Sequence, residues 1–360
     1  MTEKNSSWSF ITHITNHLKK PKILPDQKAP TLWPSEASAV IKNEWGEEST
    51  IGKCRRAVYF RYLTDHFFFY KEYSILQDDI EILEEEKLAV DPHVLWLWKA
   101  GELYEQYCID LSKESGIYLG SQSQIYIPSH NVSGKTDIIV LDLETELKRI
   151  VEVKSVYGFG AGRVMGTPAE RKRGLLGTPR ESNLMQIGLY DYWMNRTDLG
   201  FGPSMLLYGS RDTGHFAEYE ITTQRIPLVE GVEAGTETFI HYEGIAPNHT
   251  TKVNSGISIE NILRQYEYVE EYIQHTLKTY PQHKKLYVPP RDYELEYSEE
   301  KIDLMYARGQ LNKTDTTQYE KRAAQLNEGK TRVVKGVTKG DWQCSFCNFK
   351  NLCYKNNKAT

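Results

Sequence analysis

The sequence contains no apolar run that approaches the roughly 20 residues needed to span a bilayer. Residues 1–8 lack the basic and then apolar pattern of a signal peptide. The loop Gly-x4-Gly-Lys-Ser/Thr, which binds nucleotide phosphates, is also missing. We therefore expect a cytoplasmic protein that makes no contact with a membrane and has no ATP-driven motor of its own.

An excess of positive charge is missing too, because 44 Lys and Arg residues stand against 49 Asp and Glu residues, for a net charge of −5. This balance gives no global argument for binding nucleic acid. One segment runs the other way, since five cations surround the single acid Glu170: Arg163, Arg171, Lys172, Arg173 and Arg180. Such a run is more often ordinary surface, and the alternative is a local groove that binds phosphates.

Cysteine is scarce, with five residues in a chain of 360. The odd number and the missing signal peptide argue against a disulfide framework and for a reducing compartment. Three of the five form Cys344-x2-Cys347-x5-Cys353, and Cys54 stands alone near the start. These four thiolates predict a site for structural zinc or for an iron–sulfur cluster. The fifth, Cys108, lies on a predicted helix, where we expect a thiol packed in the core.

The chain changes character along its length. Residues 1–50 predict an N-terminal arm, polar and dotted with proline, followed by a helix over residues 35–45. Residues 51–300 predict one mixed α/β domain, and residues 301–360 a C-terminal extension that carries the clustered cysteines. A glycine-rich loop precedes residue 181. Helices are predicted over 93–114, 181–195 and 259–277, and strands over 123–127, 136–143, 148–156, 205–210 and 215–221.

Two of the predicted strands carry charged residues among apolar ones. Glu152 and Lys154 share one face of their strand, because side chains alternate along it. Residues 144–146 make a short connection, which predicts an antiparallel hairpin that brings Asp137 close to both. Two carboxylates can hold a hard cation such as Mg²⁺, and the lysine can orient or deprotonate an attacking water. The alternative is an edge hairpin with a surface ion pair.

Two neighbouring helices add polar residues to this group. Gln186 and Tyr190 are four residues apart on the helix over 181–195, so they lie on one face. Glu105 lies on the helix that precedes the strands. Its role stays open between an exposed helical glutamate and a further oxygen ligand.

In this order the residues resemble the PD-(D/E)XK nuclease superfamily, in its RecB-like branch. The family pattern of Gly-x-x-x-His or acid, Gly-x-x-Asp, Glu-x-Lys and Gln-x-x-x-Tyr is matched by Gly101…Glu105, Gly134…Asp137, Glu152-Val-Lys154 and Gln186…Tyr190. The resemblance covers about residues 50–225 and implies a restriction-endonuclease-like mixed sheet flanked by helices. Many members have histidine where this chain has Glu105, and an acid there shifts the metal preference towards Mg²⁺.

The resemblance also implies roles for these residues. Asp137 and Glu152, with Glu105 as a further candidate, are implied to bind Mg²⁺ or Mn²⁺. Lys154 is implied to assist the nucleophile. Gln186 and Tyr190 are implied to position DNA or the catalytic groups.

The cysteines resemble a second feature of the same branch. One N-terminal cysteine followed by a C-terminal C-x2-C-x5-C is similar to the iron–sulfur site of CRISPR-associated RecB-like nucleases and of AddB-type helicase–nucleases. The segment from Cys54 to Tyr59 is similar to that family's Cys-Pro-Arg-x-x-Tyr, with Arg55 in place of proline. The resemblance implies a 4Fe–4S cluster that closes the C-terminal part of the chain onto the N-terminal part, on Cys54, Cys344, Cys347 and Cys353.

Together, these resemblances imply a DNA exonuclease or end-processing nuclease that hydrolyses phosphodiester bonds at single-stranded or duplex ends. The family supports phage DNA processing, recombination and CRISPR adaptation, in a bacterial, archaeal or phage-infected cell. Unwinding would fall to a partner such as a helicase, a recombinase or an integrase, and the basic segment would line the DNA path. The competing class is a non-catalytic iron–sulfur subunit that binds DNA ends. The presence of Asp137, Glu152 and Lys154 together argues against it.

Overall fold

The structure is a computed structural model that describes residues 29–70, 92–227, 235–248, 251–283, 285–330 and 333–355. The predicted arm up to residue 28 therefore lies outside the described residues. Contacts within the chain divide it into two units, Met1–Pro289 and Pro290–Thr360, where the sequence predicts a boundary between residues 300 and 301. Among the described residues, no helix is long and apolar enough to cross a membrane.

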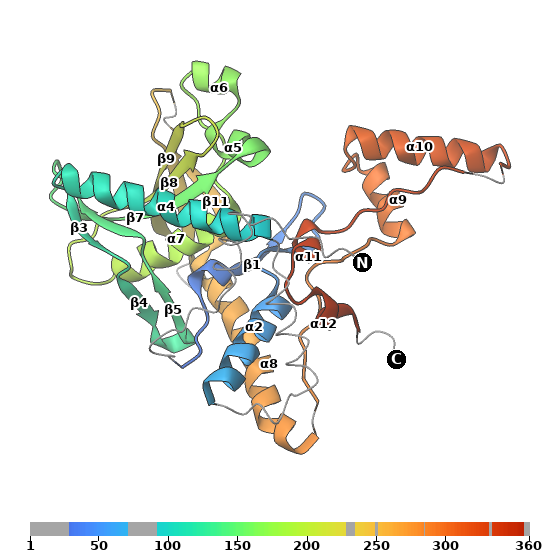
Figure 1. The fold of residues 1–360 in the computed structure, drawn as a ribbon, viewed down its shortest axis with the longest axis horizontal. Coiled ribbons are helices and arrows are strands. Elements are labelled where there is room, and N and C mark those ends of the chain that lie inside the picture. Colours follow the sequence, from blue (N-terminus) through green and yellow to red (C-terminus); the bar gives the residue numbers. More distant parts are fainter. Residues whose placement is uncertain are drawn as a thin grey trace, which may run out of the picture. The chain divides into compact units, whose positions relative to one another are not determined.

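A seven-stranded mixed sheet forms the centre of the first unit (Figure 1). Strands β7 and β8 are parallel, and every other pair of neighbours in this sheet is antiparallel. The predicted mixed α/β fold is confirmed. In spatial order the strands are β11 (Val253–Ser258), β10 (Thr236–Gly244), β9 (Phe216–Pro227), β8 (Ser204–Ser210), β7 (Lys148–Val156), β6 (Ile138–Leu141) and β3 (Tyr118–Ser121).

Helices α4 (Pro92–Glu114) and α7 (Glu181–Met194) cover opposite faces of this sheet. On β7, Val153 packs against Ile109 of α4, whereas its neighbour Glu152 contacts Gln186 of α7. The middle of α7 is buried all round, as expected for a helix enclosed in a core. On the α7 side, α2 (Arg55–Tyr70) packs against α8 (Ile259–His283). The aromatic residues Tyr59, Phe60 and Tyr62 of α2 are buried there.

The helix predicted over residues 35–45 is wrong. A single 3-10 turn, η1 (Pro34–Glu36), leads into β1 (Ser38–Lys42), which pairs antiparallel with β2 (Glu48–Gly52). The Asn261 side chain of α8 accepts a hydrogen bond from Val40 N at 3.1 Å and donates one to Val40 O at 2.6 Å. These distant partners satisfy the backbone groups that a helix would satisfy locally, so the extended conformation is favoured.

The other predicted elements of the first unit are confirmed with small shifts of their ends. The antiparallel hairpin formed by β6 and β7 is among them. The glycine-rich loop contains two short helices, α5 (Gly158–Met165) and α6 (Pro168–Lys172), and the Thr167 hydroxyl caps the second. A separate hairpin pairs the predicted strand β4 (Gln124–Ile127) with β5 (Val132–Lys135). Strands β1, β2, β3, β5, β10 and β11 were not predicted.

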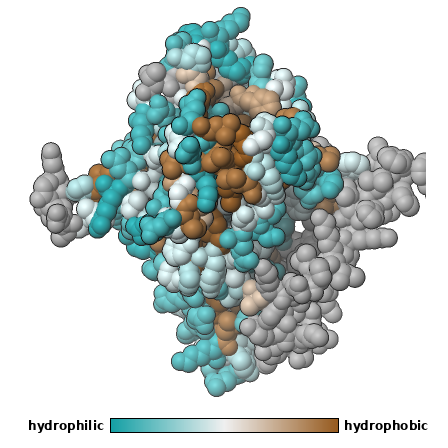
Figure 2. Space-filling view, turned by 90° about the vertical axis from the view of Figure 1, so that its left-hand side faces the viewer, coloured by the Kyte–Doolittle hydropathy of each residue, from teal (hydrophilic) through white to brown (hydrophobic). Residues whose placement is uncertain are grey.

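One face of the molecule carries a hydrophobic patch bordered by hydrophilic side chains (Figure 2). The exposed apolar residues of the described chain include Leu103, Tyr107 and Leu111 of α4. Residues four apart lie on the same side of a helix, so these three form one stripe along α4.

The second unit has a small core of its own. Ile302, Leu311 and Val337 are buried there, with Tyr297, Met305, Tyr306 and Tyr319 packed around them. Helix α9 (Glu299–Ala307) is capped by the Ser298 side chain, and α10 (Lys313–Asn327) by that of Asn312. Two short helices follow, α11 (Trp342–Ser345) and α12 (Lys350–Lys355).

Candidate active site

The hairpin of β6 and β7 brings together the three charged residues predicted from the sequence. Val151 is the partner of Ile138 across the two strands, so Asp137, just before β6, lies beside the middle of β7. The Asp137 carboxylate accepts a hydrogen bond from Val153 N at 2.8 Å. Lys154 donates one to Glu152 Oε1 at 2.5 Å, which confirms that these two side chains share a face.

Glu152 is the centre of the group and has no exposed surface. Its Oε1 accepts hydrogen bonds from Lys154 Nζ at 2.5 Å and from Gln186 Nε2 at 2.6 Å. Its Oε2 is buried and has no hydrogen-bond partner among the described residues. Burial raises the pKa of Glu152 to about 7 although Lys154 opposes the shift. A buried oxygen without a partner is costly, and packing alone does not account for it.

Lys154 and Asp137 respond differently to the same surroundings. Burial lowers the pKa of Lys154, but attraction to Glu152 and Asp137 outweighs it, so its pKa is raised. Lys154 therefore stays protonated at neutral pH, and its side chain keeps 27 % of its surface exposed. Burial raises the pKa of Asp137, while Lys154, the Val153 amide and the neighbouring Glu152 carboxyl oppose that shift. A charged lysine that reaches solvent is suited to orienting a reactant rather than to removing a proton.

Gln186 and Tyr190 both lie beside this group, as their spacing on one helix face predicts. Gln186 orients Glu152 directly through the bond to Oε1. Tyr190 is buried and donates its hydroxyl proton to Lys135 O at 3.1 Å, just before Asp137. A Cβ atom at Gly134 would lie 2.6 Å from that hydroxyl, so glycine is required for this close approach. Tyr190 is thus a positioning residue for the segment that carries Asp137.

Glu105 is half-buried on α4 and close to the same group. Its pKa is raised by burial and by the nearby Asp137. Its Oε1 accepts a hydrogen bond from Gln122 Nε2 at 2.6 Å, which holds the carboxylate in place. One turn further along α4, Cys108 packs against the cluster of Ile109, Ile138 and Val153, as predicted for a core thiol.

The donor chemistry of the three carboxylates fits a hard divalent cation, which prefers oxygen ligands. Glu152 Oε2 is the buried oxygen available to it. Across the residues that the structure describes, however, no group of three or more His, Cys, Asp or Glu side chains is arranged to hold a metal ion. In this arrangement the Lys154 ammonium supplies the positive charge beside Glu152.

The cations of the basic segment differ in whether a contact with a neighbouring residue holds them. Arg163 pairs with Glu181 at 2.7 Å, Arg171 donates to Gly166 O at 2.6 Å, and the Arg180 guanidinium lies against Gly160. Lys172 and Arg173, at the end of α6, are exposed. The sequence alone could not separate these two kinds of cation.

Two exposed aromatic residues that the sequence analysis did not single out follow β7 directly. Tyr157 is 52 % exposed and Phe159 is 96 % exposed. Gly158 between them has a φ of 56°, and its N–H donates to Asp212 Oδ2 at 2.9 Å. The Arg211 guanidinium lies 4.7 Å from the centre of the Tyr157 ring. Aromatic residues that alternate with glycine directly after the strand of Glu152 and Lys154 were the available signal.

Three of the four predicted cluster ligands lie in the second unit. Cys344 Sγ lies 3.6 Å from the Tyr354 hydroxyl, and its pKa is raised by burial and by the nearby Cys353. Cys347 donates its N–H to Cys344 O at 3.3 Å. Cys54 belongs to the first unit, where its carbonyl accepts the N–H of Val58 at the start of α2. No disulfide joins any of the five cysteines, all of which are described.

The hairpin and α7 thus provide a buried carboxyl with an unsatisfied oxygen, a second carboxyl and a protonated lysine that reaches solvent. Such a group can position a polar reactant and stabilise negative charge. Comparison of the chain with protein-family models, with characterised proteins and with solved structures finds no match.

Proposed function

We propose that the chain is a metal-dependent deoxyribonuclease, a PD-(D/E)XK enzyme of the RecB-like kind that hydrolyses phosphodiester bonds at DNA ends. The observation that carries this proposal is Glu152, a fully buried carboxyl with an unsatisfied Oε2, bonded to Lys154 and next to Asp137. A surface ion pair would need neither the burial nor the second carboxyl. Removing charged groups from water in this way costs free energy, and such buried ionisable groups cluster at functional sites.

The chain's own residues would divide the chemistry between them. Asp137 and Glu152, with Glu105 as a third candidate, would hold Mg²⁺ or Mn²⁺. The cation would supply Lewis acidity at a phosphoryl oxygen and lower the pKa of a water. Lys154, kept charged by Glu152 and Asp137, would orient the water and stabilise the negative charge that develops on the phosphate.

The surroundings of the site favour nucleic acid as the substrate. Exposed Tyr157 and Phe159 follow the strand of Glu152 and Lys154, and aromatic side chains can stack on unpaired bases. Lys172 and Arg173 offer exposed cations for phosphates in the basic segment. We propose single-stranded or duplex DNA ends as the substrate, with a helicase, recombinase or integrase as partner. Phage DNA processing, recombination and CRISPR adaptation are the candidate pathways.

The cysteines support a second proposal, a 4Fe–4S cluster bound by four thiolates. Cys353 lies close enough to Cys344 to raise the pKa of the Cys344 thiol, so two of the four thiols are neighbours in the second unit. The proposed ligands are Cys54, Cys344, Cys347 and Cys353, so the cluster would cross-link distant parts of the sequence. Structural zinc is the alternative for the same thiolates.

A nuclease assay with Mg²⁺ or Mn²⁺ on single-stranded and duplex ends tests the main proposal. Asp137→Ala, Glu152→Ala and Lys154→Ala should each reduce cleavage by about 100-fold or more while DNA binding persists. Glu102→Ala is the matched control, because Glu102 is an exposed α4 residue that pairs with Lys99. Near-wild-type cleavage by Asp137→Ala in Mn²⁺ would contradict the assignment. Wild-type protein that binds ends without cleaving them would be the non-catalytic alternative.

A further inference from the structure

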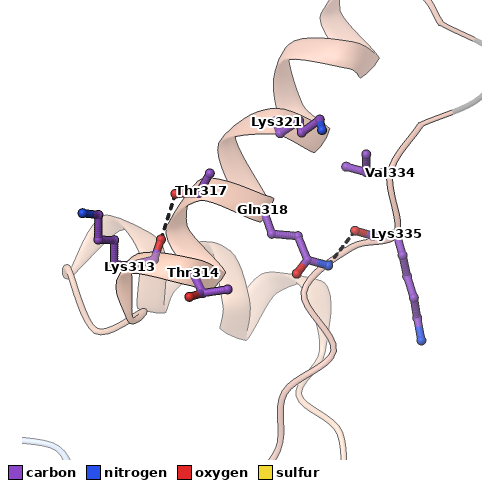
Figure 3. A pocket seen from close by; sticks show the side chains of 7 residues that line it. All are labelled: Lys313, Thr314, Thr317, Gln318, Lys321, Val334 and Lys335. Atoms are coloured by element: carbon purple, nitrogen blue, oxygen red, sulfur yellow. Dashed lines mark hydrogen bonds between the residues drawn. The ribbon is translucent and has the colours of Figure 1, made fainter.

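A pocket of about 540 Å³ lies within the second unit, along one side of α10 (Figure 3). It uses none of the residues of the candidate active site. Three of its lining residues are lysines, and most of the others carry hydroxyl or amide groups. The lining residues are Lys313, Thr314, Thr317, Gln318, Lys321, Val334 and Lys335.

Hydrogen bonds hold the two sides of this pocket together. Gln318 of α10 donates to Lys335 O at 2.9 Å and to Gly336 O at 3.0 Å. Val334 donates its N–H to Gln325 Oε1 at 2.7 Å. Val337, directly after this segment, belongs to the small core of the second unit. The pocket is therefore preformed, which reduces the ordering entropy that a ligand must overcome.

The charge of the pocket is entirely positive. None of the ammonium groups of Lys313, Lys321 and Lys335 forms an ion pair with a residue that the structure describes. Other lysines of the same unit do pair, Lys330 with Glu328 at 2.7 Å and Lys339 with Asp315 at 3.2 Å. Residues 321–358 contain nine Lys and Arg residues against two acids. Like charges left together in this way attract an anion.

The directions of the three lysines indicate what kind of anion fits. Figure 3 shows Lys313, Lys321 and Lys335 spread around the pocket, with their ends pointing apart. A single phosphate would need ammonium groups that converge on one point. A chain of phosphates can instead be met by cations at separate positions along its path.

We propose that this pocket, the lysine groove of Lys313, Lys321 and Lys335, binds the phosphodiester backbone of a DNA strand. The inference rests on the proposed nuclease function and assigns its substrate a second contact, on the other unit. The groove carries no aromatic residue in its lining, so it would hold the backbone without reading the bases.

The test compares DNA binding by the variant in which all three groove lysines are glutamine with binding by a matched control. The control replaces Lys278, Lys301 and Lys330, of which the last two pair with acids, so that the net charge changes equally. Binding is measured in EDTA, on single-stranded and on duplex DNA. Each phosphate contact contributes about −0.7 to the slope of log affinity against log salt for single strands, and about −0.9 for duplex.

Loss of three contacts should therefore flatten the slope by about 2 for a single strand and by about 3 for a duplex. For the single strand, the affinity advantage of the wild type should shrink about 20-fold between about 50 and 200 mM salt. The form of DNA, single-stranded or duplex, for which the groove variant loses more affinity is the form that occupies the groove. Equal slopes in the groove variant and the control would overturn the proposal. So would displacement of the DNA by inorganic phosphate at matched ionic strength, since that result indicates a site for one anion.

A second measurement on the wild-type protein does not depend on how the variant folds. Bound DNA should protect Lys313, Lys321 and Lys335 from acetylation, and leave Lys301 and Lys330 as reactive as before. Unchanged reactivity of the groove lysines would refute the proposal. Because neither measurement requires cleavage, a failure of the groove is distinguished from a failure of the nuclease, which the Glu152→Ala assay decides.

Discussion

Replacing Glu152 by glutamine should abolish cleavage and yet stabilise the fold above neutral pH. Burial raises the pKa of this carboxyl from 4.5 to about 7, so the folded chain binds its proton more tightly than the unfolded chain does. Stability therefore falls as pH rises from 4.5 through about 7, and the whole cost remains above that range. At about 1.4 kcal/mol for each tenfold change in proton affinity, the cost is about 3 kcal/mol.

Glutamine removes this cost because it carries no charge and has nearly the same shape. Its carbonyl can still accept the bonds from Lys154 and Gln186, and its amide would occupy the place of the unsatisfied Oε2. In this variant Lys154 keeps the negative charge of Asp137 beside it but loses that of Glu152, and this loss offsets part of the gain in stability. About 3 kcal/mol is therefore the upper limit of the difference between the two proteins above pH 7.

Urea unfolding of the wild type and of Glu152→Gln in EDTA, from acid to alkaline pH, measures this difference. The free energy of unfolding of the wild type should fall relative to the variant until about pH 7, and the difference should then stay constant. Glu102→Gln, on the exposed side of α4, should follow the wild type at every pH. Added Mg²⁺ should stabilise the wild type and not Glu152→Gln, because a ligand stabilises the state that binds it. A difference that does not change with pH would refute the reasoning, because Glu152 would then ionise as an exposed carboxyl does.

Three other substitutions test the surroundings of the site. Gly134→Ala should destabilise the fold by about 1–3 kcal/mol in thermal unfolding, because its Cβ would lie 2.6 Å from the Tyr190 hydroxyl. Gly162→Ala, whose Cβ would have no atom within 4 Å, should not destabilise it. Equal melting temperatures of the two variants would contradict the close approach at Gly134. Glutamine at Arg171, Lys172 and Arg173 together should flatten the salt dependence of DNA binding, and an unchanged slope would make the segment ordinary surface. Serine at any proposed cluster ligand should remove iron and lower thermal stability, whereas Cys108→Ser should leave the iron content unaltered. Metal analysis of anaerobically purified protein that finds stoichiometric zinc without labile sulfide would replace the cluster with a zinc site.

The candidate active site could be predicted from the sequence because its central geometry is local. Alternation along β7 places Glu152 and Lys154 on one face, and a short turn is enough to bring Asp137 beside them. The four-residue spacing of Gln186 and Tyr190 likewise fixes their common helix face. Each of these inferences depends on only a few consecutive residues.

The parts that could not be predicted depend on partners far away in the sequence. Residues 35–45 have the composition of a capped helix, but β1 is fixed by pairing with β2 and by Asn261, which is 221 residues from Val40. Strand β11 is the edge strand of the sheet and β10 is its neighbour, and the local sequence pattern does not reveal the partners of either strand. In the basic segment, Arg163 pairs with Glu181, and Arg180 lies against Gly160. Only the fold reveals these two contacts.

The role of Lys154 is the point at which the structure goes furthest beyond the sequence. From the sequence, the lysine could orient a water or remove its proton. Burial alone would lower its pKa and favour the second role, but Glu152 and Asp137 lie close enough to reverse that shift. Burial leaves Glu152 with a pKa near neutrality, although Lys154 opposes that shift. In the metal-free site, the proton that is easily exchanged near pH 7 therefore belongs to the carboxyl and not to the lysine, so its acid–base behaviour near neutral pH should follow Glu152, with Lys154 as a constant positive charge.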